Sequence, residues 1–241
     1  YNGTSWTEVN DLNTARGYLA GAGTQTAGLG FGGYVSGPNR YLNLSEEFDG
    51  SSWTEGNNLN TGRDVLGGCG TQTAGLAFGG FTPGNTGATE EYNGTSWSEQ
   101  NDLNTARRGL GGAGIQTAGL AIGGHAGGPQ AALTEEYDGT SWTSSGNLNT
   151  GREGIGTGGI QTSAIAMGGN SPPKTGEAEQ YDGTSWTVSA SMANARDSAG
   201  GAADNKTTAL CFGGRNTSNT PSTFTEEFTG TFNAARVITT S

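Results

Sequence analysis

Five tryptophans divide this chain into near-identical segments. They lie 44 to 47 residues apart, and each ends a near-copy of the sequence Tyr-Asn/Asp-Gly-Thr-Ser-Trp. Each segment also carries an apolar run that ends in a Gly-Gly pair. The pairs lie at 32–33, 79–80, 123–124, 168–169 and 213–214. Self-similarity at a fixed period of this length indicates five copies of one structural unit.

Each unit predicts four short strands, which we name a, b, c and d. In the second full unit we expect them at 66–70, 74–79, 89–92 and 96–99. The Asn-Gly or Asp-Gly dipeptide before each Thr-Ser-Trp favours a type I′ hairpin between c and d. The 46 glycines and abundant Thr, Ser and Asn suit short strands and tight turns. Four strands per unit predict an all-β, five-bladed β-propeller with antiparallel blades.

The propeller is expected to be one domain over residues 1–230. Its units fall at about 10–54, 55–98, 99–143, 144–187 and 188–230. The last unit lacks a strand d, because Phe232 takes the Trp position and Asn-Ala-Ala-Arg follows at once. Residues 5–9 have strand d sequence, so we expect them to complete the last blade and close the ring. Residues 231–241 are then a C-terminal tail. Tyr1 begins in mid-repeat, which predicts a chain processed or cut from a longer one.

The units resemble the Kelch repeat family. The resemblance rests on an apolar run and Gly-Gly doublet, as at 75–80, followed by a Tyr and a Trp, as at Tyr92 and Trp97. The Thr/Gly/Asn-rich composition is similar to that of Kelch-like arrays in virion proteins of marine bacteriophages. This resemblance implies a non-enzymatic virion protein, as a tail-fibre, spike or decoration domain at the virion surface or outside the cell. The partners it implies are host-surface glycan or protein, or neighbouring virion subunits. A bacterial secreted or surface adhesin, or a lectin-like propeller, is the alternative.

The glycine-rich strand a predicts a crowded axis. Residues 110–114 have the sequence Leu-Gly-Gly-Ala-Gly, and the other units have similar runs. Glycine weakens a strand by about 0.5–1 kcal/mol relative to alanine, so its recurrence implies close backbone approach.

Three sets of residues recur in every unit and are interpreted as structural. An arginine precedes strand a, and a glutamate lies two positions before the aromatic residue of strand c, which favours repeated salt bridges over an anion-binding ring. The tryptophans are expected to pack between blades and not to stack on sugars. The arginines are Arg16, Arg63, Arg107, Arg152 and Arg196; the glutamates are Glu46, Glu90, Glu135, Glu179 and Glu226; the tryptophans are Trp6, Trp53, Trp97, Trp142 and Trp186.

The connections between strands b and c are the irregular part of each unit, which is where recognition usually resides. They span 34–45, 81–88, 125–133, 170–178 and 215–223. All lie on one face, together with the d-to-a connections. The candidate ligand-binding residues are Tyr34, Arg40, Tyr41, Phe81, His125, Lys174 and Arg215. The alternative is that they only cover the rim. His125 is the single histidine and lacks partners at metal-ligand spacing, so we expect a surface histidine and no metal.

One pattern breaks the repeat with carboxylates. Asp64, Glu153 and Asp197 follow the arginine before strand a, where Gly17 and Arg108 stand in the other units. Near the axis they would serve as acid and nucleophile or base in a five-bladed glycosidase, or bind an axial Ca²⁺. We favour solvated or Arg-paired carboxylates, and so predict no enzyme activity and no cofactor.

The net charge, the lack of long apolar runs and the cysteine positions argue against nucleic-acid binding, membrane insertion and a disulfide. The net charge of −11 opposes nucleic acid and anionic membrane surfaces. No apolar run approaches the roughly 18 residues of a membrane span, so no membrane insertion is expected. Cys69 and Cys211 fall in the second and fifth blades, too far apart for a disulfide.

Overall fold

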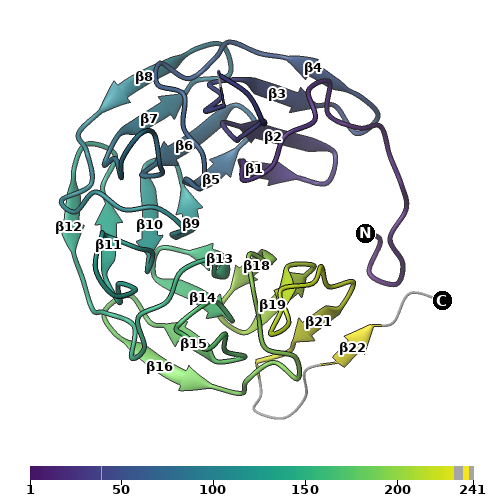
Figure 1. Cartoon of the computed structure of the whole chain (residues 1–241), viewed down its shortest axis with the longest axis vertical. Coiled ribbons are helices and arrows are strands. Elements are labelled where there is room, and N and C mark those ends of the chain that lie inside the picture. The colour runs from purple at the N-terminus through teal and green to yellow at the C-terminus, as the bar shows by residue number, and fades with distance from the viewer. Residues whose placement is uncertain (39, 231–235, 239–241) are drawn as a thin grey trace.

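The computed structural model describes residues 1–38, 40–230 and 236–238. Its strands form five antiparallel blades around a central axis, as Figure 1 shows. The predicted all-β, five-bladed propeller is therefore confirmed. The described residues include no helix able to span a membrane.

Each blade runs outward from the axis in the order a, b, c, d. The innermost strands a are β1 (Ala20–Thr24), β5 (Gly67–Thr71), β9 (Gly111–Ile115), β13 (Gly156–Ile160) and β18 (Gly200–Asn205). Strands b are β2 (Ala27–Phe31), β6 (Ala74–Phe78), β10 (Ala118–Ile122), β14 (Ser163–Met167) and β19 (Thr208–Phe212). Strands c are β3 (Ser45–Phe48), β7 (Thr89–Tyr92), β11 (Thr134–Tyr137), β15 (Ala178–Tyr181) and β21 (Thr225–Phe228). The outer strands d are β4 (Trp53–Glu55), β8 (Trp97–Gln100), β12 (Trp142–Ser144), β16 (Trp186–Ser189) and β22 (Arg236–Ile238). The short strands β17 (Arg196–Asp197) and β20 (Arg215–Asn216) pair beside the fifth blade.

The last blade corrects the predicted ring closure. Its fourth strand is β22, which pairs antiparallel with β21, and residues 5–9 form no strand. Arg236 pairs with Glu227 in the register in which Ser98 pairs with Glu91 in the second blade. A segment that follows β21 closely in sequence reaches this edge at a smaller loop-closure cost than the distant N-terminus. The predicted tail therefore contains a strand at 236–238, while 231–235, including Phe232, and 239–241 lie outside the described residues.

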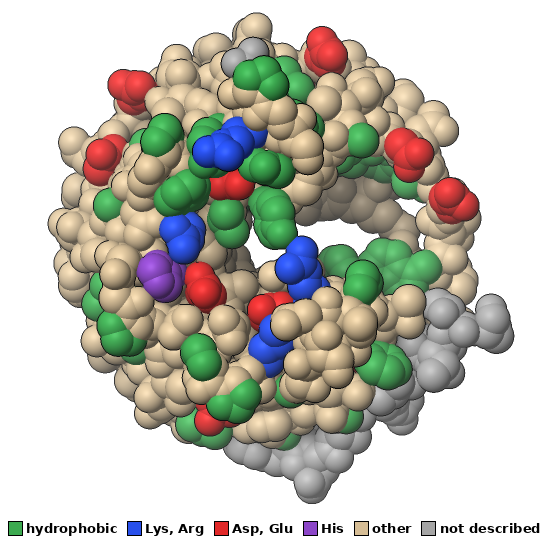
Figure 2. Space-filling model, in the orientation of Figure 1, with side chains coloured by type: hydrophobic (Ala, Val, Ile, Leu, Met, Phe, Trp, Pro, Cys, Tyr) green, Lys and Arg blue, Asp and Glu red, His purple; other side chains and the backbone are tan. Residues whose placement is uncertain are grey.

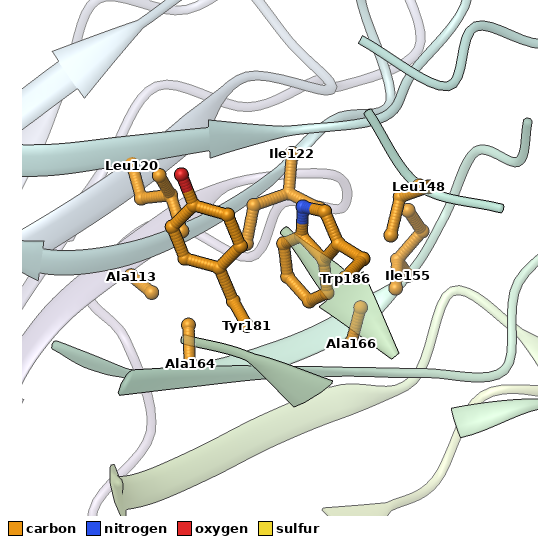
Figure 3. Close-up of a cluster of buried hydrophobic side chains, with 9 residues drawn as sticks. All are labelled: Ala113, Leu120, Ile122, Leu148, Ile155, Ala164, Ala166, Tyr181 and Trp186. Carbon is orange, nitrogen blue, oxygen red and sulfur yellow. The ribbon is translucent and has the colours of Figure 1, made fainter. Parts of the chain in front are cut away.

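The hydrophobic core lies between neighbouring blades. Figure 3 shows the cluster between the third and fourth blades, where Leu120 and Ile122 of β10 face Tyr181 and Trp186. The Trp142 ring lies 4.9 Å from the Phe78 ring of the preceding blade. Trp97, Trp142 and Trp186 each donate an indole hydrogen bond to the hydroxyl at the start of strand c in the preceding blade. These three tryptophans thus pack between blades as predicted.

The glycines of strand a are required by close approach at the axis. A Cβ atom on Gly112 would lie 2.3 Å from the carbonyl oxygen of Gly68 in the preceding blade, and one on Gly158 would lie 2.5 Å from the amide nitrogen of Ala203 in the next. Neither backbone atom can move aside cheaply. The narrow axis therefore selects glycine at these positions.

All five predicted Arg–Glu ion pairs form, each within one blade. The pairs are Arg16–Glu46, Arg63–Glu90, Arg107–Glu135, Arg152–Glu179 and Arg196–Glu226. The five arginine side chains are fully buried, so their guanidinium groups connect strand c to the segment before strand a and are not presented to an external anion.

Candidate functional site

The candidate site is a set of bridged backbone positions on the face that carries the b-to-c connections. In each blade, the residue after the buried arginine forms an antiparallel backbone β-bridge with the first residue of the b-to-c connection. That first residue forms a second β-bridge with a later residue of the same connection. The five trios are Gly17–Tyr34–Tyr41, Asp64–Phe81–Asn85, Arg108–His125–Gln130, Glu153–Asn170–Lys174 and Asp197–Arg215–Pro221. The backbone arrangement repeats while the side chains differ in every blade. Nine of the ten residues singled out for ligand binding or catalysis lie in these trios, and Arg40 lies beside Tyr41.

Four aromatic rings form a continuous row over the first two blades. The ring centroids are 6.5 Å apart for Tyr18 and Tyr34, 6.3 Å for Tyr34 and Tyr41, and 5.8 Å for Tyr41 and Phe81. All three pairs meet edge to face, which is a favourable arrangement for aromatic rings. Tyr18 is 46 % exposed, and the other three rings are half-buried. The row is therefore ordered by its own contacts and still open to solvent.

Guanidinium groups flank this aromatic row. Arg40 lies over the Tyr41 ring at 5.2 Å, and Arg108 lies over the Phe81 ring at 4.9 Å, both within the range of cation–π attraction. At the other end, Arg215 of the fifth blade donates a 2.9 Å hydrogen bond to the hydroxyl of Tyr18. Figure 2 shows Lys and Arg side chains gathered around the axial opening on this face.

Tyr18 and Arg108 are site residues that the sequence prediction missed. Both stand at positions that vary between units, since Val65 and Ser198 occupy the place of Tyr18 in two other blades. An alignment of the units would have singled them out. Their contacts with Tyr34 and Phe81 depend on how neighbouring blades meet, and that arrangement is absent from the repeat pattern.

The fourth and fifth blades contribute a polar half of the face. Lys174 pairs with Asp197 at 3.1 Å and donates to the side-chain oxygen of Asn219 at 2.7 Å. Lys174 therefore links two neighbouring connections.

His125 is half-buried, and its Nδ1 accepts a 3.2 Å hydrogen bond from the Gly127 amide.

The three predicted axial carboxylates have separate surroundings. Asp64 is buried, and burial raises the pKa of its carboxyl group, although Arg108 and Arg40 act in the opposite direction. Glu153 accepts a hydrogen bond from Gln130 at 3.5 Å, and Asp197 pairs with Lys174. Over the described ranges, no group of three or more His, Cys, Asp or Glu side chains is placed to hold a metal ion.

The axial opening on this face is lined by the residues that enter the innermost strands. A cavity of about 610 Å³ is bordered by Tyr18, Val65 and Ser198, which all have positive φ, at 56°, 49° and 52°. Non-glycine residues in this conformation are uncommon and concentrate at functional sites. Amide-to-carbonyl hydrogen bonds join successive blades here, from Val65 to Tyr18, Gly109 to Val65, Gly154 to Gly109 and Ser198 to Gly154, at 2.7 to 2.9 Å.

The opposite face repeats one structural turn. The Asp or Asn that begins a c-to-d turn in each of the first four blades accepts hydrogen bonds from the amides two and three residues later; these residues are Asp49, Asn93, Asp138 and Asp182. Asn2 accepts the same two bonds in the N-terminal segment. The same amides lower the pKa values of Asp49, Asp138 and Asp182. These side chains therefore stabilise the turn.

No family model matches the chain, and no curated protein matches it.

Proposed function

We propose that this propeller is a non-enzymatic binding module that recognises a surface glycan through the face of the b-to-c connections. The observation that carries the proposal is the row of Tyr18, Tyr34, Tyr41 and Phe81, flanked by Arg40 and Arg108. Aromatic rings offer flat apolar surfaces to the C–H faces of sugars, and guanidinium groups donate several hydrogen bonds. Exposed aromatic and arginine side chains are also the types that dominate binding energy in interfaces.

The biological setting that we propose is the surface of a bacteriophage virion, as a tail-fibre, spike or decoration domain. The support is the resemblance of the repeats to Kelch-like arrays in marine phage virion proteins, together with the net charge of −11, which disfavours nucleic acid. The partner is then host-surface glycan or protein, or a neighbouring virion subunit. Detection of the chain in purified particles by mass spectrometry supports this setting, and detection in a bacterial surface fraction alone supports an adhesin.

Binding of the chain to a glycan array tests the proposed site. Replacing Tyr34, Tyr41 and Phe81 together by alanine is expected to weaken binding at least about tenfold, because a loss of 1.4 kcal/mol is one order of magnitude. The control variant is Thr95→Ala, at an exposed position in a c-to-d turn of the opposite face. Unchanged binding of the triple variant contradicts the proposed site. Binding to virion subunits without glycan binding favours a scaffolding role.

The glycosidase alternative is separated by a second triple variant, Asp64→Asn, Glu153→Gln and Asp197→Asn. The binding proposal expects this protein to keep its glycan affinity. Hydrolysis of a host polysaccharide by the wild type, and its loss in the variant, would establish the enzyme instead.

A further inference from the structure

Four of the junctions between blades share one backbone hydrogen bond. The second glycine of each Gly-Gly pair donates its amide to the carbonyl of the buried arginine in the next blade. These bonds run from Gly33 to Arg63, Gly80 to Arg107, Gly124 to Arg152 and Gly169 to Arg196, at 2.8 to 2.9 Å. We call these four the closed junctions.

The junction between the fifth and first blades lacks this bond, and we call it the open junction. In the described part of the chain, no hydrogen bond joins the Gly214 amide to the Arg16 carbonyl. A Cβ atom on Gly213 would meet its nearest neighbour only at 4.0 Å, whereas one on Gly123 would lie 2.6 Å from the Arg152 carbonyl oxygen. The series of amide-to-carbonyl hydrogen bonds around the axis likewise begins at the Tyr18 carbonyl and ends at the Ser198 amide, without such a bond across this junction among the described residues. The inner part of the open junction therefore lacks the contacts of a neighbouring blade.

The apolar side chains at the open junction are incompletely covered. On the fifth blade, Leu210 and Phe212 are half-buried, while their equivalents in the other four blades are at most 2 % exposed. On the first blade, Trp53 is half-buried, whereas Trp97, Trp142 and Trp186 are 5–6 % exposed. Both walls of this junction thus present the residues that elsewhere lie between two blades.

Two cavities extend from the axis along these walls. One, of about 780 Å³, is lined by the innermost strands together with Leu210, Phe228 and Tyr1. The other, of about 490 Å³, reaches Gly28 and Trp53 of the first blade. Figure 2 shows the central opening continuing outward on the side of the N-terminal segment.

The outer rim of the open junction is already occupied by residues 1–6. The Tyr1 hydroxyl donates to Glu227 as that of Tyr137 donates to Glu91 at a closed junction. The Trp6 ring lies 5.0 Å from Phe212, which matches the 4.9 Å between Trp142 and Phe78. Gln25 donates to the Tyr1 carbonyl at 2.8 Å, as Gln116 donates to that of Tyr92 at 2.7 Å.

Residues 1–6 therefore make the contacts of a c-to-d turn in a sixth blade position, between the fifth blade and the first. Figure 1 shows this segment following the outer edge of the ring across the gap. Residues 5–9 therefore do not complete the fifth blade as predicted; the N-terminal segment contacts that blade through side chains, one blade position further round the ring.

We propose that the open junction accepts strands a, b and c of a sixth copy of the chain's own repeat, joined directly to Tyr1. A glycine-rich strand a fits beside Gly21 and Gly201, and an apolar strand b covers Trp53. The arginine carbonyl of the added unit receives the Gly214 amide, and its Gly-Gly amide reaches the Arg16 carbonyl. Each requirement of the junction is a feature that every unit of this sequence contains.

The experiment adds a copy of residues 101–136 immediately before Tyr1, so that the copied Glu136 precedes Tyr1 as Glu136 precedes Tyr137 in the chain. We expect slower hydrogen exchange at the Gly214 and Tyr18 amides, weaker quenching of Trp6 fluorescence by acrylamide, and a melting temperature higher by about 2–4 °C. The matched control carries valine in place of the copied Gly112, which crowds β18 and abolishes these changes.

Three outcomes overturn the proposal. The first is an added copy that stays unprotected from exchange while the rest of the protein folds. The second is an extended chain that aggregates where the original chain is soluble. The third is a dimer of the original chain that protects Gly214, which would identify a second copy of the protein as the occupant.

Discussion

The junction between the second and third blades and the junction between the fifth and first blades are built from the same repeat but differ in what they bury. At the former, Trp142 packs on Phe78, and Gly112 approaches the backbone of Gly68. At the latter, Trp6 supplies the ring contact at the rim, and the inner part contains a cavity. A neighbouring blade therefore completes the burial of a repeat unit, as in repeat proteins whose stability is a sum of neighbour terms.

The comparison also separates what the sequence motif requires from what its surroundings require. Gly21 and Gly112 occupy equivalent positions, yet a Cβ atom on Gly21 meets only the Leu29 carbonyl of its own blade at 3.3 Å. The same residue type is thus under steric constraint at Gly112 and free of contact with a neighbouring blade at Gly21.

Substitution of tryptophan gives the largest expected difference between the two junctions. Trp142→Ala removes a ring that is 5 % exposed, together with its hydrogen bond to Thr89, and should lower the free energy of unfolding by about 3–5 kcal/mol. Trp6 is 42 % exposed, so Trp6→Ala should lower it by only about 1 kcal/mol. Urea denaturation of both variants measures the two values. Equal losses would show that the N-terminal segment is integrated as tightly as a complete blade.

Glycine substitution gives a smaller difference and tests the inner part of each junction. Gly112→Val places a side chain against a backbone carbonyl that cannot move, so we expect a loss of about 1–3 kcal/mol. Gly21 lines the cavity, so Gly21→Val should change the free energy of unfolding by less than about 0.5 kcal/mol. Thermal unfolding of the matched pair provides the measurement. A severe loss in Gly21→Val would mean that this cavity is closed in solution.

The strands were predictable because local signals specify them. Asn-Gly or Asp-Gly turns and Gly-Gly pairs set each strand within a residue or so, and 89–92 matches β7 without error. The fourth strand of the last blade was not predictable in this way, because residues 236–238 lack the turn and tryptophan that mark strand d in the other units. Residues 5–9 carry that tryptophan but lie at another blade position. The number of blade positions around the axis is likewise a property of how blades meet, which no single unit encodes.

The candidate site was predictable in its positions and not in its contacts. Topology places every b-to-c connection on one face, so Tyr34, Phe81 and Lys174 were found from their loops alone. The aromatic row and the stacking of Arg108 on Phe81 join neighbouring blades, so the sequence of a single unit does not specify them. The three carboxylates share a repeat position but not an environment, because each blade supplies a different neighbour.

The smallest expected difference between the junctions concerns tyrosine and depends on pH. Burial, followed by the hydrogen bond to Glu91, raises the pKa of the Tyr137 phenol, and at the open junction the pKa of Tyr1 is raised in the same direction. A phenol whose folded pKa exceeds its unfolded value of about 10 stabilises the fold fully below pH 10, and this stabilisation is lost as the pH rises further.

Tyr137→Phe should therefore lower the free energy of unfolding by about 1 kcal/mol at pH 8, and its difference from the wild type should shrink above pH 10. Tyr1→Phe should leave the urea midpoint nearly unchanged across this range, because both partners are only half-buried and water screens the pair. Urea titrations from pH 8 to about pH 11 measure both effects. A loss in Tyr1→Phe as large as that in Tyr137→Phe, with the same pH dependence, would remove the distinction between the two junctions at their outer rims.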